Sequence, residues 1–142
     1  MSVNEKIILK HSSVNGSVMK KKTVHRGEIY YLNLGYQPRA VQSGVRPVLI
    51  VQNDVGNYYS DTVIVSPITS QIKKLNMPTH VLLMPGCTGL KALSMVMLEQ
   101  LITVEKTQLL ERIGNVCSQD LKQINQAICI SMGVKAQNQE TK

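Results

Sequence analysis

The stretch Gly44-Val45-Arg46-Pro47-Val48-Leu49-Ile50-Val51-Gln52-Asn53-Asp54 places one cation at the start of an apolar strand. Gly44 can adopt backbone angles that other residues avoid, and Pro47 fixes φ and gives up one backbone donor. The four residues that follow Pro47 are β-branched or leucine, which is typical of a buried strand. We therefore expect a rigid strand that holds the guanidinium of Arg46 at its beginning.

A second stretch has the same character. Thr62-Val63-Ile64-Val65-Ser66-Pro67-Ile68-Thr69-Ser70-Gln71 is predicted to be a buried strand that ends in hydroxyl and amide side chains. If the two strands pair, Arg46 and Thr69 would face one pocket. A lone arginine before a strand more often caps it or lies on the surface, so this interpretation depends on the motifs around it.

Weaker signals predict the other elements. They are, in chain order, a strand over 27–34, a polar loop over 35–43, a turn over 53–61, a short strand over 79–84, a long strand over 94–104 buried on both sides, a connecting element over 109–113, and a helix capped by Ser118 and ended by Gly133. Short strands with one terminal helix indicate a mainly β protein built as a small, strongly curved sheet or barrel.

Length and composition limit the class of protein. The 142 residues suit one domain, and 43% hydrophobic residues can form one core. The apolar runs are of strand length and no signal peptide is evident, so we expect a cytoplasmic protein without a membrane span. Cys87, Cys117 and Cys129 are odd in number and lack metal-ligand spacing, which predicts free thiols and no metal.

The net charge of +7 is unevenly distributed. Residues 1–24 carry five lysines and one glutamate, and we expect them to form a basic, disordered extension. The folded domain should cover 25–133, followed by a disordered tail over 134–142. No acid occurs over 29–53 or 62–98, whereas these segments contain several basic residues, namely Arg39, Arg46, Lys73, Lys74 and Lys91. A fold that places these two acid-free segments on one face would attract polyanions, unless the spacing of the acids is a matter of chance.

Two neighbouring tyrosines, Tyr58 and Tyr59, lie in the predicted turn over 53–61. Their rings could stack on nucleic-acid bases. Packing against the sheet is the commoner use of such side chains.

Five blocks occur in a fixed order. They are Arg-Gly-Glu-Ile-Tyr-Tyr (26–31), the Arg46 stretch (44–54), Thr-Val-Ile-Val-Ser-Pro-Ile-Thr (62–69), Pro-Thr-His-Val (78–81) and Leu-Glu-Gln (98–100). Together they resemble the MazF/PemK family of toxin endoribonucleases, over about residues 25–133. The resemblance implies the SH3-like barrel that this family shares with CcdB toxins, a homodimer and a cognate antitoxin protein.

The resemblance also implies metal-independent cleavage of single-stranded RNA, including mRNA, in which the ribose 2′-hydroxyl attacks the adjacent phosphate and leaves a cyclic phosphate and a 5′-hydroxyl. Arg46 and Thr69 match the catalytic arginine and threonine of the family. A fixed guanidinium and a hydroxyl donor would stabilise the charge that develops on the phosphoryl oxygens. The expected RNA contacts are polar residues of the adjoining loops, which are Arg39, Gln42, Ser43, Ser70, Gln71, Lys73, Lys74 and Gln100.

The sequence departs from the family at two places. Arg39-Ala40-Val41-Gln42 stands where relatives commonly have Gly-Ser-Glu-Gln, so an acidic residue is missing, and Ile102 replaces a residue that is often basic. Arginine is a poor general base, since its pKa is above about 12. Three hypotheses therefore stand: an active endoribonuclease, a degenerate member that binds RNA or antitoxin without cleavage, and, least favoured, a gyrase poison of the CcdB type.

Overall fold

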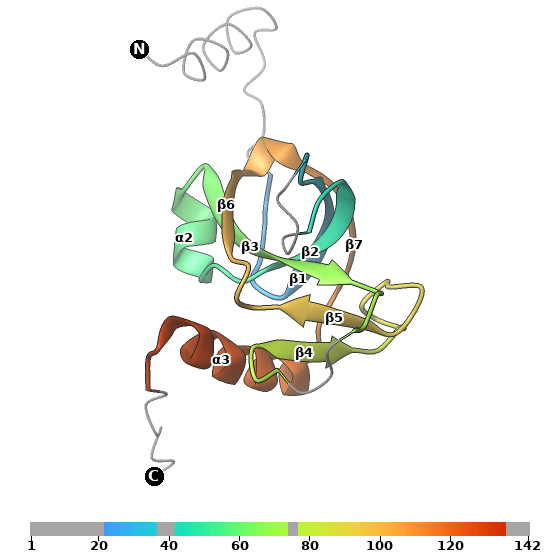
Figure 1. Ribbon diagram of the computed structural model, residues 1–142. Coiled ribbons are helices and arrows are strands. Elements are labelled where there is room, and N and C mark those ends of the chain that lie inside the picture. The colour runs from blue at the N-terminus through green and yellow to red at the C-terminus, as the bar shows by residue number, and fades with distance from the viewer. Residues whose placement is uncertain (1–21, 37–41, 74–76, 136–142) are drawn as a thin grey trace, which may run out of the picture.

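The computed structural model describes residues 22–36, 42–73 and 77–135, and this part of the chain forms a strongly curved antiparallel sheet with a helix at its C-terminal end (Figure 1). The strands are β1 (Glu28–Asn33), β2 (Val45–Ile50), β3 (Thr62–Thr69), β4 (His80–Leu83), β5 (Ser94–Met97), β6 (Ile102–Glu105) and β7 (Leu109–Asn115). The helices are α2 (Asp54–Tyr59), the 3-10 turn η1 (Lys106–Gln108) and α3 (Ser118–Met132). No helix in these ranges combines the length and apolar character that crossing a membrane requires.

Strand β3 is the centre of the sheet. Along one edge it pairs with β2, from Val48 opposite Pro67 to Ile50 opposite Val65. Along its other edge, the first half pairs with β6 and the last two residues pair with β5. The strand order is β4-β5-β3-β2-β1-β7, and the ladder among the described strands is not closed between β4 and β7. The predicted mainly β fold with a C-terminal helix is confirmed.

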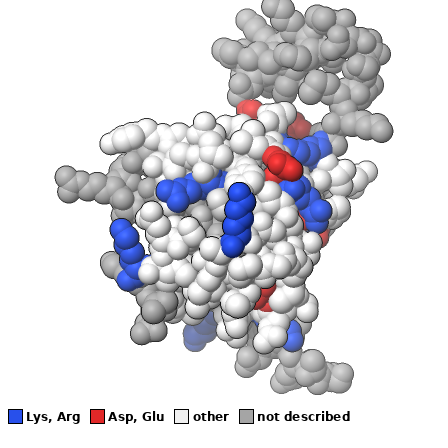
Figure 2. All heavy atoms as spheres, turned by 90° about the vertical axis from the view of Figure 1, so that its right-hand side faces the viewer, with Lys and Arg blue, Asp and Glu red and all other residues white. Residues whose placement is uncertain are grey.

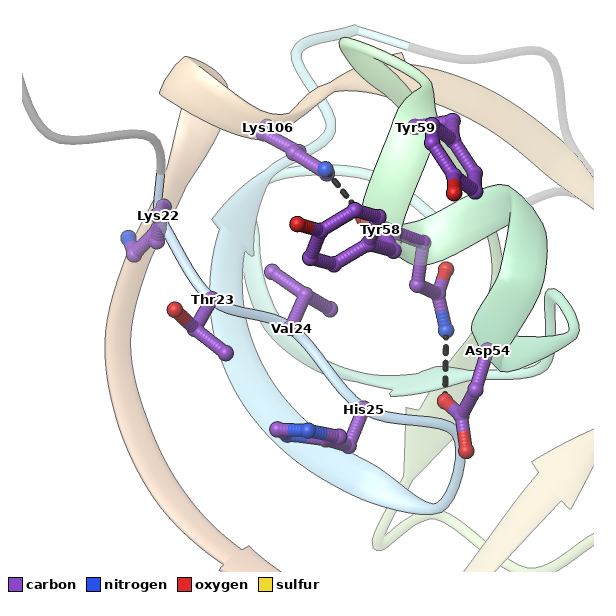
Figure 3. A pocket seen from close by; sticks show the side chains of 9 residues that line it. Lys22, Thr23, Val24, His25, Asp54, Tyr58, Tyr59 and Lys106 are labelled. Carbon is purple, nitrogen blue, oxygen red and sulfur yellow. Dashed lines mark hydrogen bonds between the residues drawn. The ribbon is translucent and has the colours of Figure 1, made fainter.

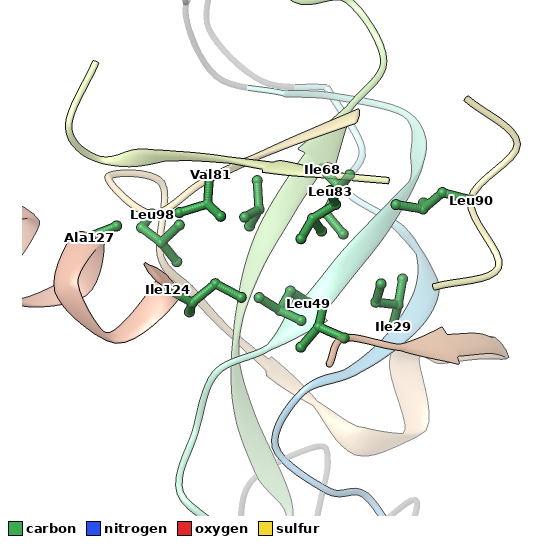
Figure 4. Close-up of a cluster of buried hydrophobic side chains, with 11 residues drawn as sticks. Ile29, Leu49, Ile68, Val81, Leu83, Leu90, Leu98, Ile124 and Ala127 are labelled. Atoms are coloured by element: carbon green, nitrogen blue, oxygen red, sulfur yellow. The ribbon is translucent and has the colours of Figure 1, made fainter. Parts of the chain in front are cut away.

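Both faces of the sheet are buried, because alternate residues of a strand point to opposite sides. Ile29 and Leu49 belong to a cluster that α3 covers with Ile124 and Ala127 (Figure 4). Their strand neighbours belong to a second cluster on the opposite face, which consists of Val24, Tyr30, Leu32, Leu34, Val48, Ile50, Val63, Val65 and Leu109. The curved sheet therefore has two cores.

The ordered domain begins earlier than the expected boundary at residue 25. Val24 is 3% exposed and packs into the second cluster. The ammonium of Lys22 donates to the carbonyls of Leu109 at 2.6 Å and Leu110 at 3.0 Å. The prediction of disorder is therefore wrong for 22–24, because one buried valine and one anchored lysine are enough to hold this segment. The remainder of the predicted extension, residues 1–21, lies outside the described residues.

The predicted long strand over 94–104 is wrong. The chain forms β5, turns with a hydrogen bond from Gln100 N to Met97 O at 3.1 Å, and then forms β6. The cause is the shared strand: Thr69 pairs with Met95, while Thr62 pairs with Glu105 at the opposite end of β3. An uninterrupted strand could not follow both halves of β3 through the bend of the sheet.

Two other local predictions also fail. The predicted turn over 53–61 contains helix α2, which Asn53 caps by accepting a hydrogen bond from Gly56 N at 2.8 Å. The predicted connecting element over 109–113 is strand β7, which pairs with β1 at the sheet edge.

The terminal helix is confirmed, with one difference at its start. It ends at Gly133, whose φ of +69° lies in the left-handed region. Its N-cap is Cys117, which makes no side-chain capping bond, in place of the predicted Ser118. The predicted tail over 134–142 is described only at Val134 and Lys135, and Val134 N donates to Cys129 O at 2.8 Å as part of the helix end.

Candidate active site

Strand pairing brings the β2 segment that begins near Arg46 against the strand that ends at Thr69. The ladder between β2 and β3 runs from Ile50 opposite Val65 to Val48 opposite Pro67, and Thr69 itself pairs with Met95 of β5. The sequence-based condition, that the two strands pair, is met.

Backbone contacts hold Arg46 in place. Its Nε donates to the carbonyl of Ser43 at 3.0 Å. The loop before it is closed at its base, because Gly44 N donates to Gly35 O and Leu34 N donates to Gly44 O, each at 2.8 Å. Gly44 has a φ of +76°, which favours glycine at this turn. The two terminal nitrogens of Arg46 bond to no described residue, so a bidentate anion could occupy them.

Thr69 is nearly buried, at 3% exposure. Its Oγ1 accepts a hydrogen bond from Gln71 N at 3.1 Å, which leaves the hydroxyl proton available for donation. The same bond sets the direction of the chain as it leaves β3, so Thr69 also positions Ser70 and Gln71, both of which are exposed.

A shallow pocket of about 210 Å³ opens beside Arg46. Its lining includes Ser70, which follows Thr69, Lys91 from the segment before β5, and Ser94, the first residue of β5. Apolar side chains of three strands and of the Leu90–Ala92 segment form its floor. The remaining lining residues are Tyr31, Val45, Pro47 and Ile68. The pocket thus joins two cations, three hydroxyls and an apolar floor, but Thr69 itself is not among the residues that line it.

Gln100 acts on the site through the backbone. Its Oε1 accepts from Gln42 N at 3.0 Å, and its Nε2 donates to Met97 Sδ at 3.7 Å. This contact anchors the residue next to Ser43, whose carbonyl holds Arg46. Gln42, Ser43 and Gln100 are each half-buried. The structure therefore joins these three predicted RNA contacts into one support for the arginine.

The basic side chains lie on an outer face. Lys73 is exposed in the loop after β3, while Arg39 and Lys74 lie outside the described residues. Figure 2 shows the side of the molecule on which β3 ends and β5 begins, with several lysine or arginine side chains spread across it and fewer acidic side chains among them. Ion pairs among the described residues use Glu28 and Glu99, and none involves Arg46.

Sequence reasoning did not assign Lys91 and Tyr31 to the site. Lys91 lies in the acid-free segment 62–98, which was the one signal that could have pointed to it. Tyr31 alternates with buried Tyr30 and Leu32 along β1, and nothing in the sequence distinguishes a pocket tyrosine from a packed one.

Residues 25–132 match the model of a protein family described as PemK-like, MazF-like toxin of type II toxin-antitoxin system. The chain is 40% identical over 111 residues to Endoribonuclease MazF of Staphylococcus saprophyticus, which covers 78% of this chain and 92% of that protein. It is 38% identical over 111 residues to Endoribonuclease EndoA of Bacillus subtilis, covering 78% and 96%.

The fold is also similar to that of a solved structure. An endoribonuclease in complex with its cognate antitoxin from Mycobacterial species superposes with a TM-score of 0.67 at 26% identity, covering 80% of this chain and 98% of that one. The similarity therefore extends over most of the described domain.

Proposed function

Because the chain belongs to the PemK-like, MazF-like toxin family of type II toxin-antitoxin systems, we propose that it is a toxin whose endoribonuclease activity cleaves single-stranded RNA, including mRNA, at specific sequences. The observation that carries this proposal is the geometry of Arg46, which the Ser43 carbonyl and the closed loop hold at the start of the strand that pairs with β3. A preorganised cation of this kind is what a developing phosphoryl charge needs.

The reaction follows from these groups. The ribose 2′-oxygen loses its proton and attacks the adjacent phosphorus, the bond from phosphorus to the 5′-oxygen breaks, and the leaving oxygen takes up a proton. The products are a 2′,3′-cyclic phosphate and a 5′-hydroxyl. The terminal nitrogens of Arg46 bind two phosphoryl oxygens, and Lys91 adds a second positive charge at the pocket. The Thr69 hydroxyl donates a hydrogen bond to the phosphoryl group once RNA binding has exposed this buried side chain.

Proton transfer uses other groups. Among the described residues that line the pocket there is neither a carboxylate nor a histidine. Tyr31 and Lys91 are the titratable side chains there besides Arg46. We assign proton transfer to water, since an arginine does not give up its proton near neutral pH.

The test is to incubate the purified full chain with a long single-stranded RNA in EDTA and to map both ends of each fragment. The proposal expects cleavage at a recurring short sequence, with cyclic-phosphate and 5′-hydroxyl ends, and no cleavage by Arg46→Ala. Binding of RNA without new ends would instead identify a degenerate binding protein. Inhibition of gyrase by the purified chain in a topoisomerase assay would instead identify a gyrase poison.

The proposed partners are a second copy of the chain and a cognate antitoxin, both in the cytoplasm. Exposed apolar side chains on β4, directly after it and directly before β5 support docking: Leu82 is 44%, Met84 67% and Leu93 41% exposed. An acidic antitoxin segment that folds on binding would place carboxylates near Arg46 and Lys91 and exclude RNA. Titration of a non-cleavable RNA into the toxin–antitoxin complex tests this exclusion, and a ternary complex of undiminished affinity would rule it out.

A further inference from the structure

A larger pocket, of about 520 Å³, lies between the N-terminal segment and α2 (Figure 3). It is lined by the segment Lys22–His25, by α2 residues and by Lys106. It shares no lining residue with the pocket beside Arg46. Strand β2 separates the two pockets, because Arg46 lies near the start of β2 and α2 follows its end. The four residues of strand between Arg46 and Ile50 alone span about 13 Å. The volume falls within the usual range of small-ligand sites.

The most exposed wall of this pocket is aromatic. Tyr58 projects from α2 toward the N-terminal segment (Figure 3), and Tyr58 and Tyr59 are each 74% exposed. Their ring centroids are 4.7 Å apart at an interplanar angle of 83°, an edge-to-face contact that restrains the Tyr58 ring. An exposed and restrained aromatic face is a stacking platform for a planar ligand.

Positive charge is held at the opposite side of the pocket. The ammonium of Lys22 donates to two backbone carbonyls and lies 5.3 Å from the centre of the Tyr30 ring. An ammonium has three N–H donors, and among the described residues these two carbonyls are its hydrogen-bond acceptors. The His25 side chain, 61% exposed, lies nearer to Asp54 in the lining, with its Nδ1 3.6 Å from Glu28 Oε1 (Figure 3). The Lys22 end of the pocket therefore suits an anionic group such as a phosphate.

One acceptor completes the site. Asp54 Oδ1 accepts from Arg26 N at 2.7 Å and from Asn57 Nδ2 at 3.1 Å, whereas its Oδ2 bonds to no described residue. These hydrogen bonds, with the Arg26 amide first, lower the pKa of Asp54, so the group is a carboxylate at neutral pH. A carboxylate oxygen in the same lining as a stacking ring suits a donor on a base, such as the amino group of adenine or cytosine.

We propose that this pocket binds one nucleotide, with its base stacked on Tyr58, a base amino group donating to Asp54 and its phosphate beside Lys22. The same chemistry can come from two sources, a free nucleotide or one nucleotide of an RNA strand held elsewhere on the protein. The second source rests on the proposed endoribonuclease function, and the first does not.

The test uses the full chain with Arg46→Ala, so that RNA stays intact. Binding of AMP, CMP and UMP is followed by the NMR shift of the His25 ring protons and by tyrosine fluorescence, since the sequence has no tryptophan. Tyr58→Ala is expected to weaken binding by about 5- to 150-fold, because stacking is worth about 1–3 kcal/mol per base. Tyr58→Phe keeps the ring and is expected to bind within about threefold of the parent. Met132→Ala, an exposed change on α3, serves as the surface control.

A second arm compares a short RNA, long enough only for the cleavage pocket, with a longer one. If mononucleotides bind and Tyr58→Ala abolishes that binding, the pocket holds a free nucleotide. If only the longer RNA loses affinity in Tyr58→Ala, the pocket holds one nucleotide of a strand. Unchanged affinity for every ligand in Tyr58→Ala overturns the proposal even where RNA is still cleaved by the wild-type chain. Mononucleotide binding by a chain that cleaves no RNA overturns only the proposed function.

Discussion

Gln100 Oε1 accepts a hydrogen bond from Gln42 N at 3.0 Å, across 58 positions of sequence. The next residue, Ser43, holds the guanidinium of Arg46 with its carbonyl. The turn after β5 therefore fixes the loop before β2, and that loop fixes the arginine. A residue without direct contact to Arg46 can in this way control its orientation.

Replacement of Gln100 should consequently affect turnover more than binding. Gln100→Ala removes the acceptor for Gln42 N, a bond worth about 1 kcal/mol, and we expect kcat to fall about fivefold. Gln100→Glu keeps an acceptor oxygen but adds a negative charge, so kcat should be retained while KM for RNA rises. Steady-state cleavage of a fluorogenic RNA measures both values. A rise in KM alone in Gln100→Ala would show that Gln100 only contacts RNA.

Arg46→Ala should lower kcat/KM by a hundred- to thousandfold, since loss of one preorganised donor at a charge-developing site costs about 3–4 kcal/mol. Arg46→Lys should recover little of this, because a lysine cannot bind two phosphoryl oxygens in the fixed fork of a guanidinium. Lys122→Ala, which removes an exposed cation on α3, is the matched control and should cleave at the parental rate. Circular dichroism should show all three variants folded. Parental cleavage by Arg46→Ala would refute the assignment.

The pair of His80 and Glu99 should make the fold sensitive to acid. Burial raises the pKa of Glu99, but hydrogen bonds from His80 Nε2 at 2.8 Å and Thr79 Oγ1 at 2.7 Å outweigh it, and the pKa of Glu99 is lowered in the fold. A carboxyl with a lowered pKa stabilises the fold fully above its unfolded pKa of about 4.3, and this stabilisation is lost as the pH falls through the folded pKa.

Urea denaturation at a series of pH values below about 5 measures this effect. We expect the free energy of unfolding to fall more steeply with decreasing pH in the wild type than in Glu99→Gln. Asp54 also has a lowered pKa in the fold, and its contribution is common to both proteins, so only their difference reports on Glu99. Parallel pH profiles would show that Glu99 contributes nothing.

Gly89 should tolerate no side chain. A Cβ added there would lie 1.8 Å from the carbonyl oxygen of Ile113, and its φ is +72°. Gly133 has nearly the same φ, +69°, with no atom within 4 Å of such a Cβ. Gly133→Ala is therefore expected to destabilise by about 1–2 kcal/mol from backbone strain alone, and Gly89→Ala by clearly more.

Thermal unfolding followed by circular dichroism compares the two glycine variants. Because Leu90, Lys91 and Ala92 line the pocket beside Arg46 directly after Gly89, Gly89→Ala should also reduce cleavage at temperatures where it remains folded. Equal loss of stability in both variants would mean that the backbone around Ile113 can move away from the added methyl group without a measurable cost in free energy.

The sequence predicted β1, β2, β3 and β4 well, because each is a short run of alternating or wholly apolar residues with turn signals at both ends. It failed over 94–104 because both β5 and β6 are apolar and the turn between them contains no glycine or proline. Helix α2 was missed since its six residues are too short to show a helical period. The failure over 94–104 is therefore a place where strand pairing decides the local conformation.

The candidate site was predictable in part. The pairing of β2 with β3 follows from two apolar runs joined by a short connection. The burial of Thr69 and the position of Lys91 in the pocket depend instead on the conformation of the 85–93 loop and of β5, which the sequence does not reveal. Arg26 illustrates the same limit. Its motif suggested the family, yet the side chain bridges the sheet and the terminal helix, with Nε donating to Val51 O at 2.9 Å and Nη2 to Asn125 Oδ1 at 2.7 Å.

Strand β3 pairs with β2, β5 and β6 and contributes side chains to both cores. Neither half of the molecule can open without breaking it, so the domain should unfold as one cooperative unit. Backbone amides of Val63, Val65 and Ile68 are then expected to exchange with solvent deuterium only through global unfolding, while those of α2 exchange through local opening. The protein would therefore expose partly unfolded forms rarely, and proteases that cleave unfolded chains should digest it slowly.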